Sequence, residues 1–314
     1  MRVLFMGSPD FALPCLDQLL RVPHQVMGVV TQPDRPKGRG NQVGYTPVKE
    51  RALENNIPVY QPEKVNDPAF IELIRSLAPE VIVVVAFGQI LKPALLDIPP
   101  LGCINVHASL LPQYRGSAPI HWAVINGEKE TGVTTMYMDA GMDTGDMILK
   151  QSIPIEPNDT TGMLHDKLAA VGAEILIKTL ILLAQGQAPR VPQDHHQATY
   201  APLLKREHEW VDWEKTSREV HNLVRGMNPW PGAYTTFDSK VVKVWETRLE
   251  EEASSGVPGT LLAVVAGKGI KVQCRKGSVW LTQVQPQGKR IMEADAFARG
   301  YRADQGRTLG SDRL

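Results

Sequence analysis

Two polar side chains end an otherwise apolar stretch of the sequence. Asn105 and His107 lie two residues apart in the run GCINVH at 102–107. In a β-strand, side chains at this spacing share one face and lie roughly 6.6 Å apart. Both polar groups can therefore meet at one small ligand, or they can form hydrogen bonds with the loop that follows, because buried polar groups need partners.

A glycine-rich turn further along the chain carries three carboxylates. The segment MDAGMDTGD covers residues 138–146. It is not a calcium loop, because the twelfth position counted from Asp139 is Lys150, where such a loop needs a bidentate glutamate. Ordinary turn chemistry explains Asp139 and Asp146. A carboxylate from this turn can also orient His107, which would complete an Asn–His–Asp cluster.

Such a cluster suits the transfer of an acyl-type group to an amine. Attack by the amine produces a tetrahedral centre with a developing oxyanion, and each donor aimed at it contributes ~3–4 kcal/mol. The amide of Asn105 and the imidazolium of His107 are such donors, and a nearby carboxylate favours the charged imidazole. No cysteine or serine nucleophile motif accompanies the pair, so we expect direct attack by the acceptor.

The elements that must hold these residues follow an alternating pattern. Short apolar runs, typical of strands buried on both faces, alternate with helix-like segments over residues 1–188. The pattern predicts an α/β domain with a doubly wound, Rossmann-like, mostly parallel sheet. The expected strands are 2–6, 26–31, 81–86, 102–106, 131–138 and 147–155, and the expected helices are 10–20, 47–55, 68–77, 117–126 and 160–185.

A change in composition marks the end of this domain. Residues 189–206 are rich in proline, glutamine and alanine and lack periodicity, which predicts a linker. Residues 207–314 contain one helix-like segment and several short strand-like runs, which predicts a small β-barrel, OB-like domain. The helix is expected at 216–227 and the strands at 234–237, 241–247, 260–265, 269–274 and 278–284.

Composition excludes several classes of protein. The 314 residues carry 34 Lys plus Arg and 34 Asp plus Glu, so nucleic-acid binding must come from local patches. Three widely spaced cysteines without a CxxC pair argue against a disulfide framework and fit a cytoplasmic location. No histidine has a partner at zinc spacing, so no metal is expected. No apolar stretch is long enough to span a membrane.

Two regions are locally basic. One is a long loop, Thr31–Lys49, and long loops in compact domains are usually functional or disordered. The other is residues 260–314, which contain ten basic and four acidic residues. This excess of positive charge favours contact with nucleic acid. The basic residues of the loop are Arg35, Lys37, Arg39 and Lys49.

The first strand is not followed by a dinucleotide fingerprint. A Rossmann domain that binds NAD or FAD carries GxGxxG at this point. Here the sequence from Gly7 is GSPDFA, which lacks the second and third glycines. A dinucleotide cofactor is therefore not expected.

Taken in order, the motifs of this chain resemble those of the folate-dependent formyltransferases. They are GSPDFA, TQPDRPKGRG, VVVAFGQIL, GCINVHASLLPQYRGSAPIHWAVINGE, TGVTTMYMDAGMDTGDM and MNPWPGAYT. The resemblance runs from residue 1 to about 190 and again over 226–247. Together with the second, barrel-like domain it points to the branch of the family that acts on methionyl-tRNA.

The resemblance implies roles for particular residues. The catalytic Asn, His and Asp of the family match Asn105, His107 and Asp143. Its tetrahydrofolate-binding stretch matches Ser109, Leu110, Leu111 and Pro112, and the backbone around Phe87, Gly88, Gln89 and Ile90 is expected to line the pterin pocket. Its tRNA-contacting loop matches the segment with Arg35, Lys37, Arg39 and Lys49, and Arg39 matches its important arginine.

The resemblance also implies a reaction. The formyl group of 10-formyltetrahydrofolate, a co-substrate, would pass to the free amino group of initiator methionyl-tRNA for translation initiation, with no membrane and no obligatory protein partner. Three alternatives remain at this point. They are formyl transfer to a small-molecule amine, a non-catalytic RNA-binding protein and, least favoured by the missing glycines, a dehydrogenase.

Overall fold

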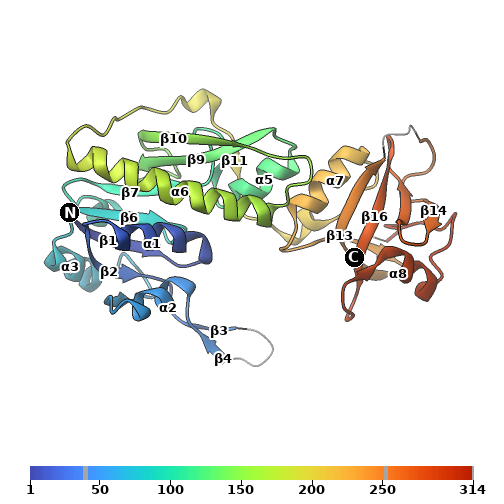
Figure 1. Cartoon of the computed structure of the whole chain (residues 1–314), viewed down its shortest axis with the longest axis horizontal. Helices are drawn as coiled ribbons and strands as arrows, with labels where there is room; N and C mark the ends of the chain where they lie inside the picture. Colours follow the sequence, from blue (N-terminus) through green and yellow to red (C-terminus); the bar gives the residue numbers. More distant parts are fainter. Residues whose placement is uncertain (38–41, 251–253, 313–314) are drawn as a thin grey trace. The chain divides into compact units, whose positions relative to one another are not determined.

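The computed structural model describes residues 1–37, 42–250 and 254–312, which fall into two compact units. Figure 1 shows the chain from its N-terminal α/β part to its C-terminal β part. Unit 1 consists of Met1–Ser117, Glu130–Ile153 and His165–Ala201. Unit 2 consists of Ala118–Lys129, Pro154–Leu164 and Pro202–Leu314.

Unit 1 is built on a seven-stranded sheet in the order β10–β9–β7–β6–β1–β2–β5. The pairs from β7 through β6 and β1 to β2 and β5 are parallel, and β9 runs antiparallel to β7. The strands are β1 (Arg2–Gly7), β2 (Gln25–Val30), β5 (Val59–Tyr60), β6 (Val81–Val85), β7 (Cys103–His107), β9 (Glu130–Tyr137) and β10 (Met147–Pro154). This arrangement is the Rossmann-like domain that the alternating sequence pattern predicts.

The central strands are apolar because helices cover both of their faces. All five residues of β6 are buried, as are the last five of β1. The helical elements of unit 1 are η1 (Asp10–Ala12), α1 (Leu13–Arg21), α2 (Pro47–Glu54), α3 (Pro68–Leu77), α4 (Pro93–Leu96), η2 (His195–Gln197) and most of α6 (Thr161–Ala184). On α6, a Cβ at Gly172 would lie 3.1 Å from a methyl group of Val106, so glycine lets this helix approach β7 closely.

Local sequence signals set where the helices begin. The hydroxyl of Thr46 accepts a hydrogen bond from Lys49 N at the start of α2, and Asp67 does the same for Ala69 N at the start of α3. Proline follows each cap, where its missing N–H costs nothing. Two short pairs of strands complete unit 1: β3 (Arg35–Lys37) with β4 (Gln42–Gly44), and β8 (Arg115–Gly116) with β11 (Tyr200–Ala201).

Unit 2 contains an antiparallel sheet in the order β12–β13–β16–β15–β14, with β17 beside β16. Its strands are β12 (Ala233–Phe237), β13 (Lys240–Glu250), β14 (Leu261–Val265), β15 (Gly269–Gln273), β16 (Ser278–Pro286) and β17 (Met292–Glu293). Its helices are α5 (Pro119–Ile125), η3 (Arg206–Glu209), α7 (Ser217–Gly226) and α8 (Ala294–Tyr301). The predicted fold class, a Rossmann-like domain followed by a small β domain, is confirmed. Within the described ranges, no helix is long and apolar enough to cross a membrane.

The division of the chain differs from the one expected from sequence. The helix expected at 117–126 and the start of the one expected at 160–185 belong to unit 2, although both lie before residue 188. Most of the segment 189–206, expected to be a linker, belongs to unit 1 because it forms β11 and other backbone pairs there. Periodicity shows which face of an element is buried, but not which core that face joins.

A buried histidine gives unit 2 a dependence on pH. His221 on α7 is 5% exposed; its Nδ1 lies 2.9 Å from the Thr247 hydroxyl and its Nε2 lies 3.4 Å from Pro157 O. Burial, with a smaller contribution from the charges of Arg225 and Arg218, lowers the pKa of His221 below its ordinary value of 6.5. The unfolded chain therefore takes up a proton at a higher pH than the folded chain does.

We expect the free energy of unfolding to fall as the pH drops through 6.5, and His221→Gln to make this fall shallower. Urea denaturation at pH 7.5, 6.5 and 5.5 measures the effect. His196→Gln is the matched control, because His196 is exposed. An unchanged pH slope in His221→Gln would show that this histidine does not contribute.

Candidate active site

Asn105, His107 and Asp143 converge in unit 1 at the carboxyl end of β7. Asp143 Oδ1 lies 3.5 Å from Asn105 Nδ2 and 3.7 Å from His107 Nδ1. The side chain of His107 is 7% exposed and that of Asp143 is 17% exposed. Ligands of open α/β sheets bind beyond the carboxyl ends of the strands, so the three groups lie where a reacting molecule is expected.

The imidazole of His107 has a defined orientation. Its Nε2 lies 3.0 Å from Tyr114 O. A carbonyl oxygen only accepts hydrogen bonds, so Nε2 carries a proton and donates it to this bond. The other ring nitrogen, Nδ1, faces Asp143. The geometry therefore leaves Nδ1 as the nitrogen of His107 that can serve a substrate.

Asp143 is held in an uncommon backbone conformation. Its φ is +53°, in the left-handed region that few residues other than glycine adopt. Its Oδ2 accepts a hydrogen bond of 2.9 Å from Gly116 N. A side chain at Gly145 would place its Cβ 1.9 Å from Tyr137 O, so the loop can close only with glycine at that position.

The other acidic residues of this loop have structural roles. Asp139 Oδ1 accepts hydrogen bonds from Gly141 N at 3.0 Å and from the Thr144 hydroxyl at 2.6 Å. Asp146 lies 3.8 Å from the guanidinium of Arg190, in a partly exposed pair. Of the three carboxylates, the one at Asp143 is therefore the one placed at the site.

The stretch predicted to bind folate, 109–112, is fixed mainly through its backbone. Thr134 Oγ1 accepts a hydrogen bond from Leu111 N at 3.1 Å and donates one to Ser109 O at 2.7 Å. Ser109 and Leu111 are buried, whereas Leu110 and Pro112 are half-buried. Leu110 and Pro112 are therefore the residues of this stretch that remain partly accessible.

The loop after β6, predicted to line a pterin pocket, lies at the same edge of the sheet. Phe87 is buried, and its carbonyl accepts a 2.9 Å hydrogen bond from the Gln32 side chain. Gln89 Oε1 accepts one of 2.9 Å from Val65 N, so this amide is engaged within unit 1. Gly88 is exposed with a φ of +83°, and Ile90 is 76% exposed.

The four basic residues of the loop differ in exposure and in their partners. Arg35 is exposed in the β3–β4 hairpin, which projects past α2 in Figure 1. Lys37 ends β3, and Arg39 lies outside the described residues. Lys49 is only 13% exposed, and its ammonium group pairs with Asp34 and donates a 2.8 Å hydrogen bond to Gln61. Lys49 thus fixes the base of the loop and does not project from it.

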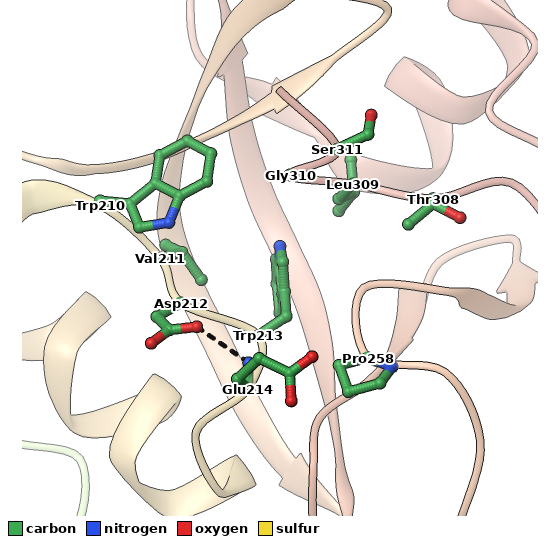
Figure 2. Close-up of a pocket in the computed structure, with 10 residues that line it drawn as sticks. All are labelled: Trp210, Val211, Asp212, Trp213, Glu214, Pro258, Thr308, Leu309, Gly310 and Ser311. Carbon is green, nitrogen blue, oxygen red and sulfur yellow. Dashed lines mark hydrogen bonds between the residues drawn. The ribbon is translucent and has the colours of Figure 1, made fainter. Parts of the chain in front are cut away.

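Unit 2 contains a separate small cavity of about 180 Å³. Figure 2 shows the stretch from Trp210 to Glu214 on one side of it and the stretch from Thr308 to Ser311 on the other. Asp212 and Glu214 are its charged lining residues. Two carboxylates repel phosphate groups, so this cavity does not suit a polyanionic substrate. Across the described ranges, no cluster of three metal-ligating side chains occurs.

Sequence reasoning missed the groups that hold the three side chains in place. They are Tyr114 O on His107, Gly116 N on Asp143, and the Thr134 hydroxyl under the 109–112 stretch. The first two are backbone groups, which every residue carries, so the residue types gave no signal. Their position in the motif PQYRGSAP, directly after the predicted folate stretch, was the available hint.

Comparison with protein families matches both parts of the chain. The family model described as formyl transferase covers residues 1–180, and the model described as formyl transferase, C-terminal domain, covers residues 203–302. The methionyl-tRNA formyltransferase of Desulforamulus reducens is 55% identical over 99% of this chain and 98% of its own length. That of Clostridioides difficile is 52% identical over 99% of this chain and 100% of its own length.

Solved structures share the fold at low sequence identity. HypX from Aquifex aeolicus, solved with tetrahydrofolic acid, has a TM-score of 0.65 at 19% identity and covers 95% of this chain and 47% of its own. The N-formyltransferase from Helicobacter canadensis, solved with folinic acid and dTDP-3-aminofucose, has a TM-score of 0.63 at 19% identity over 93% of this chain and 98% of its own. With both family models matched in sequence and the full length shared with curated relatives, the chain belongs to the formyl transferase family.

Proposed function

We propose that this chain transfers the formyl group of 10-formyltetrahydrofolate to the free amino group of initiator methionyl-tRNA. The observation that carries the proposal is the convergence of Asn105, His107 and Asp143 on one point in a chain that belongs to the formyl transferase family. Full-length similarity to relatives named methionyl-tRNA formyltransferase supports the choice of acceptor.

The chemistry follows from the charges that the reaction creates. The amine attacks the formyl carbon and gives a tetrahedral centre whose oxygen becomes negative. Asn105 Nδ2 and a protonated His107 Nδ1 are the donors available to this oxygen, and preorganised donors stabilise it most where water is excluded. When the centre collapses, the bond to the folate nitrogen breaks, and His107 can supply the proton that this nitrogen needs.

Asp143 accepts the proton that the amine loses, directly or through a water molecule. The α-amino group has an ordinary pKa of about 7.7–8.0, so about a fifth to a third of it is neutral near pH 7.4 and a weak base suffices. Asp143 Oδ1 faces both Asn105 and His107 while Oδ2 is occupied by Gly116 N. In this proposal Oδ2 holds the side chain in place through Gly116 N, and Oδ1 is the oxygen that accepts the proton.

Formyl folate is proposed to bind against the two loops at this edge of the sheet. The first comprises Ser109, Leu110, Leu111 and Pro112, and the second comprises Phe87, Gly88, Gln89 and Ile90. Both follow adjacent parallel strands, β7 and β6, whose carboxyl ends form the usual binding edge of such sheets. The side chains of His107 and Asp143 lie at the same edge, which supports this proposed position of the folate.

The acceptor end of the tRNA is proposed to contact the β3–β4 loop through Arg35, Lys37 and Arg39. Lys49 supports the loop through Asp34 and is not assigned a phosphate contact of its own. We further propose a cytoplasmic location. All three cysteines are free and buried, which fits a reducing compartment, and burial raises the pKa of each thiol to about 12.

Arg39→Ala should weaken the use of tRNA without changing the chemistry. Each phosphate contact that is lost reduces the slope of log affinity against log salt by about 0.7–0.9. We expect KM for methionyl-tRNA to rise and its salt dependence to flatten by about this amount, with KM for folate unchanged. Arg75→Ala on α3 is the matched control, because Arg75 is exposed and pairs with Glu72. An unchanged salt slope would remove Arg39 from the interface.

A comparison of acceptors tests the proposed function as a whole. The chain is incubated with 10-formyltetrahydrofolate and, in separate reactions, with methionyl-tRNA, free methionine, an aminosugar nucleotide and glycinamide ribonucleotide. We expect formylation of methionyl-tRNA at a kcat/KM at least about 10³-fold above that of any small amine, because tRNA contacts add binding energy. Transfer confined to a small-molecule amine would overturn the tRNA assignment and keep the formyl chemistry.

A further inference from the structure

The segment that follows α6 forms hydrogen bonds with the backbone of Asp143 and of Tyr114, next to the candidate active site. Residues 191–201, which we call the strap, belong to unit 1 and pair with it at both ends. Val191 and Met147 exchange backbone hydrogen bonds of 2.9 and 3.0 Å. At the other end, Ala201 in β11 runs parallel to Gly116 in β8, and Ala201 O accepts a 2.9 Å hydrogen bond from Ser117 N.

Gln193 on the strap is buried, and both the nitrogen and the oxygen of its side-chain amide form hydrogen bonds. Its Nε2 donates hydrogen bonds of 2.8 Å to Asp143 O and of 2.8 Å to Gly145 O. Its Oε1 accepts bonds from Nε and Nη2 of Arg115, at 3.1 and 2.7 Å. The partners fix the orientation of this amide, because an arginine can only donate and a carbonyl can only accept.

Among the residues that the structure describes, Arg115 is the largest of the fully buried side chains, with 2% exposure. Its guanidinium is held by Gln193 and, at 3.2 Å, by Nδ1 of His195, which is also on the strap. Both of these partners are neutral, since a ring nitrogen that accepts from arginine carries no proton. A buried cation satisfied by neutral acceptors is costly unless each contact is kept, so the strap and Arg115 hold each other in place.

A second set of contacts reaches His107. The hydroxyl of Thr199 on the strap accepts a 2.8 Å hydrogen bond from Tyr114 N, and Thr199 O accepts one of 2.9 Å from Arg115 N. Tyr114 has a φ of +58°, and its carbonyl is the group that receives His107 Nε2–H. The strap therefore fixes the backbone that orients His107, as Gln193 fixes the backbone of Asp143.

We propose that the strap is a positioning element of the active site, in which Gln193 sets Asp143 and Thr199 sets His107. The expected effect on the rate of formyl transfer rests on the proposed function. The expected effect on the conformation of the loop that carries Asp143 does not. Gln193 and Thr199 act through other residues and are positioning residues. The substitution that isolates the effect is Gln193→Glu, which keeps the shape of the side chain and gives Arg115 a carboxylate partner but loses both donors to the catalytic loop.

The first measurement is hydrogen–deuterium exchange, which needs no substrate. In Gln193→Glu we expect faster exchange in the peptide that covers 138–147 and no change in peptides of unit 2. The melting temperature should stay within about 4 °C of wild type. Gln187→Glu is the matched control, because Gln187 is exposed and lies outside the strap. Unchanged exchange in 138–147 would overturn the proposal.

The second measurement is the rate of formyl transfer. Misplacing a catalytic group by about 1 Å costs up to about 100-fold, so we expect Gln193→Glu to lower kcat by about 10- to 100-fold with little change in either KM. In an Asp143→Ala background the same substitution should cost less than about twofold more, because Gln193 acts through Asp143.

The parallel test uses Thr199→Val in a His107→Ala background. Losses that multiply in both double variants would show that the strap acts by another route and would overturn the proposal. Absence of transfer in the wild-type chain would instead contradict the proposed function, and the exchange result would still decide whether the strap holds the loop.

Discussion

Replacing His107 by alanine is expected to lower kcat for formyl transfer by about 10³-fold or more. The substitution removes a donor to the oxyanion, which costs about 10²–10³, and it removes the proton source for the leaving nitrogen, which adds to the loss. KM for 10-formyltetrahydrofolate should change little, because the proposed folate contacts come from 109–112 and 87–90. Steady-state kinetics with methionyl-tRNA measure both constants.

The control for this prediction separates chemistry from folding. His107 is buried and bonded to Tyr114 O, so its loss can also destabilise the loop. His107→Gln places an amide Nε2 donor near the position of the imidazole Nε2, toward Tyr114 O, and should restore stability without restoring kcat. A His107→Ala variant that retains kcat within tenfold of wild type would exclude a catalytic role for this residue.

Asp143→Asn is expected to lower kcat by about 10²–10⁴, the range for loss of a positioned base. The amide oxygen of asparagine can still accept the hydrogen bond from Gly116 N, so the loop should keep its conformation. What is lost is the negative charge that faces Asn105 and His107. Asp139→Asn is the matched control, since Asp139 bonds only within its own turn in the described contacts.

The two aspartate variants give opposite expected results from the same chemical change. Asp139→Asn should reduce stability slightly and leave kcat within about twofold, because its effects stay in the turn. Asp143→Asn should reduce kcat and leave the melting temperature nearly unchanged. Equal effects on kcat at both positions would mean that the loop, and not the carboxylate of Asp143, is what the reaction needs.

Much of unit 1 could be predicted from the sequence, for identifiable reasons. The continuous apolar run at Val81–Val85 forms a strand buried on both faces, as such runs predict. The spacing of Asn105 and His107 put both side chains on one face of β7 because the strand repeat is two residues. Asp143 is 36 residues beyond His107 along the chain. The residue pattern offered a carboxylate of this turn as a partner for His107, and only resemblance to the family selected Asp143.

Other features could not be predicted because they depend on partners that are distant in sequence. Gln193 lies in a proline-rich segment without periodicity, and its importance comes from two backbone carbonyls 50 and 48 residues away. Lys49 carries the charge expected of a phosphate-binding residue, but Asp34 neutralises it. Helix α8, formed by residues 294–301, follows a turn-rich stretch and was not expected.

The boundary between the units shows the same limitation. The segments 118–129 and 154–164 belong to unit 2, although they interrupt the sequence of unit 1. In unit 2, Thr161 donates a 2.7 Å hydrogen bond to Gly226 O, and Arg225 donates one of 3.0 Å to Asp159 O. These contacts bring together residues more than 60 positions apart. A local sequence pattern cannot predict them.

The most direct test is single-turnover transfer from 10-formyltetrahydrofolate to methionyl-tRNA by the double variant Asn105→Ala, His107→Ala. If both side chains act on one negative oxygen, the double variant should be little slower than the worse single variant, while tetrahydrofolate still binds with a Kd within a few-fold of wild type. Transfer at a rate near wild type, or two losses that simply multiply, would contradict a shared site at the end of β7.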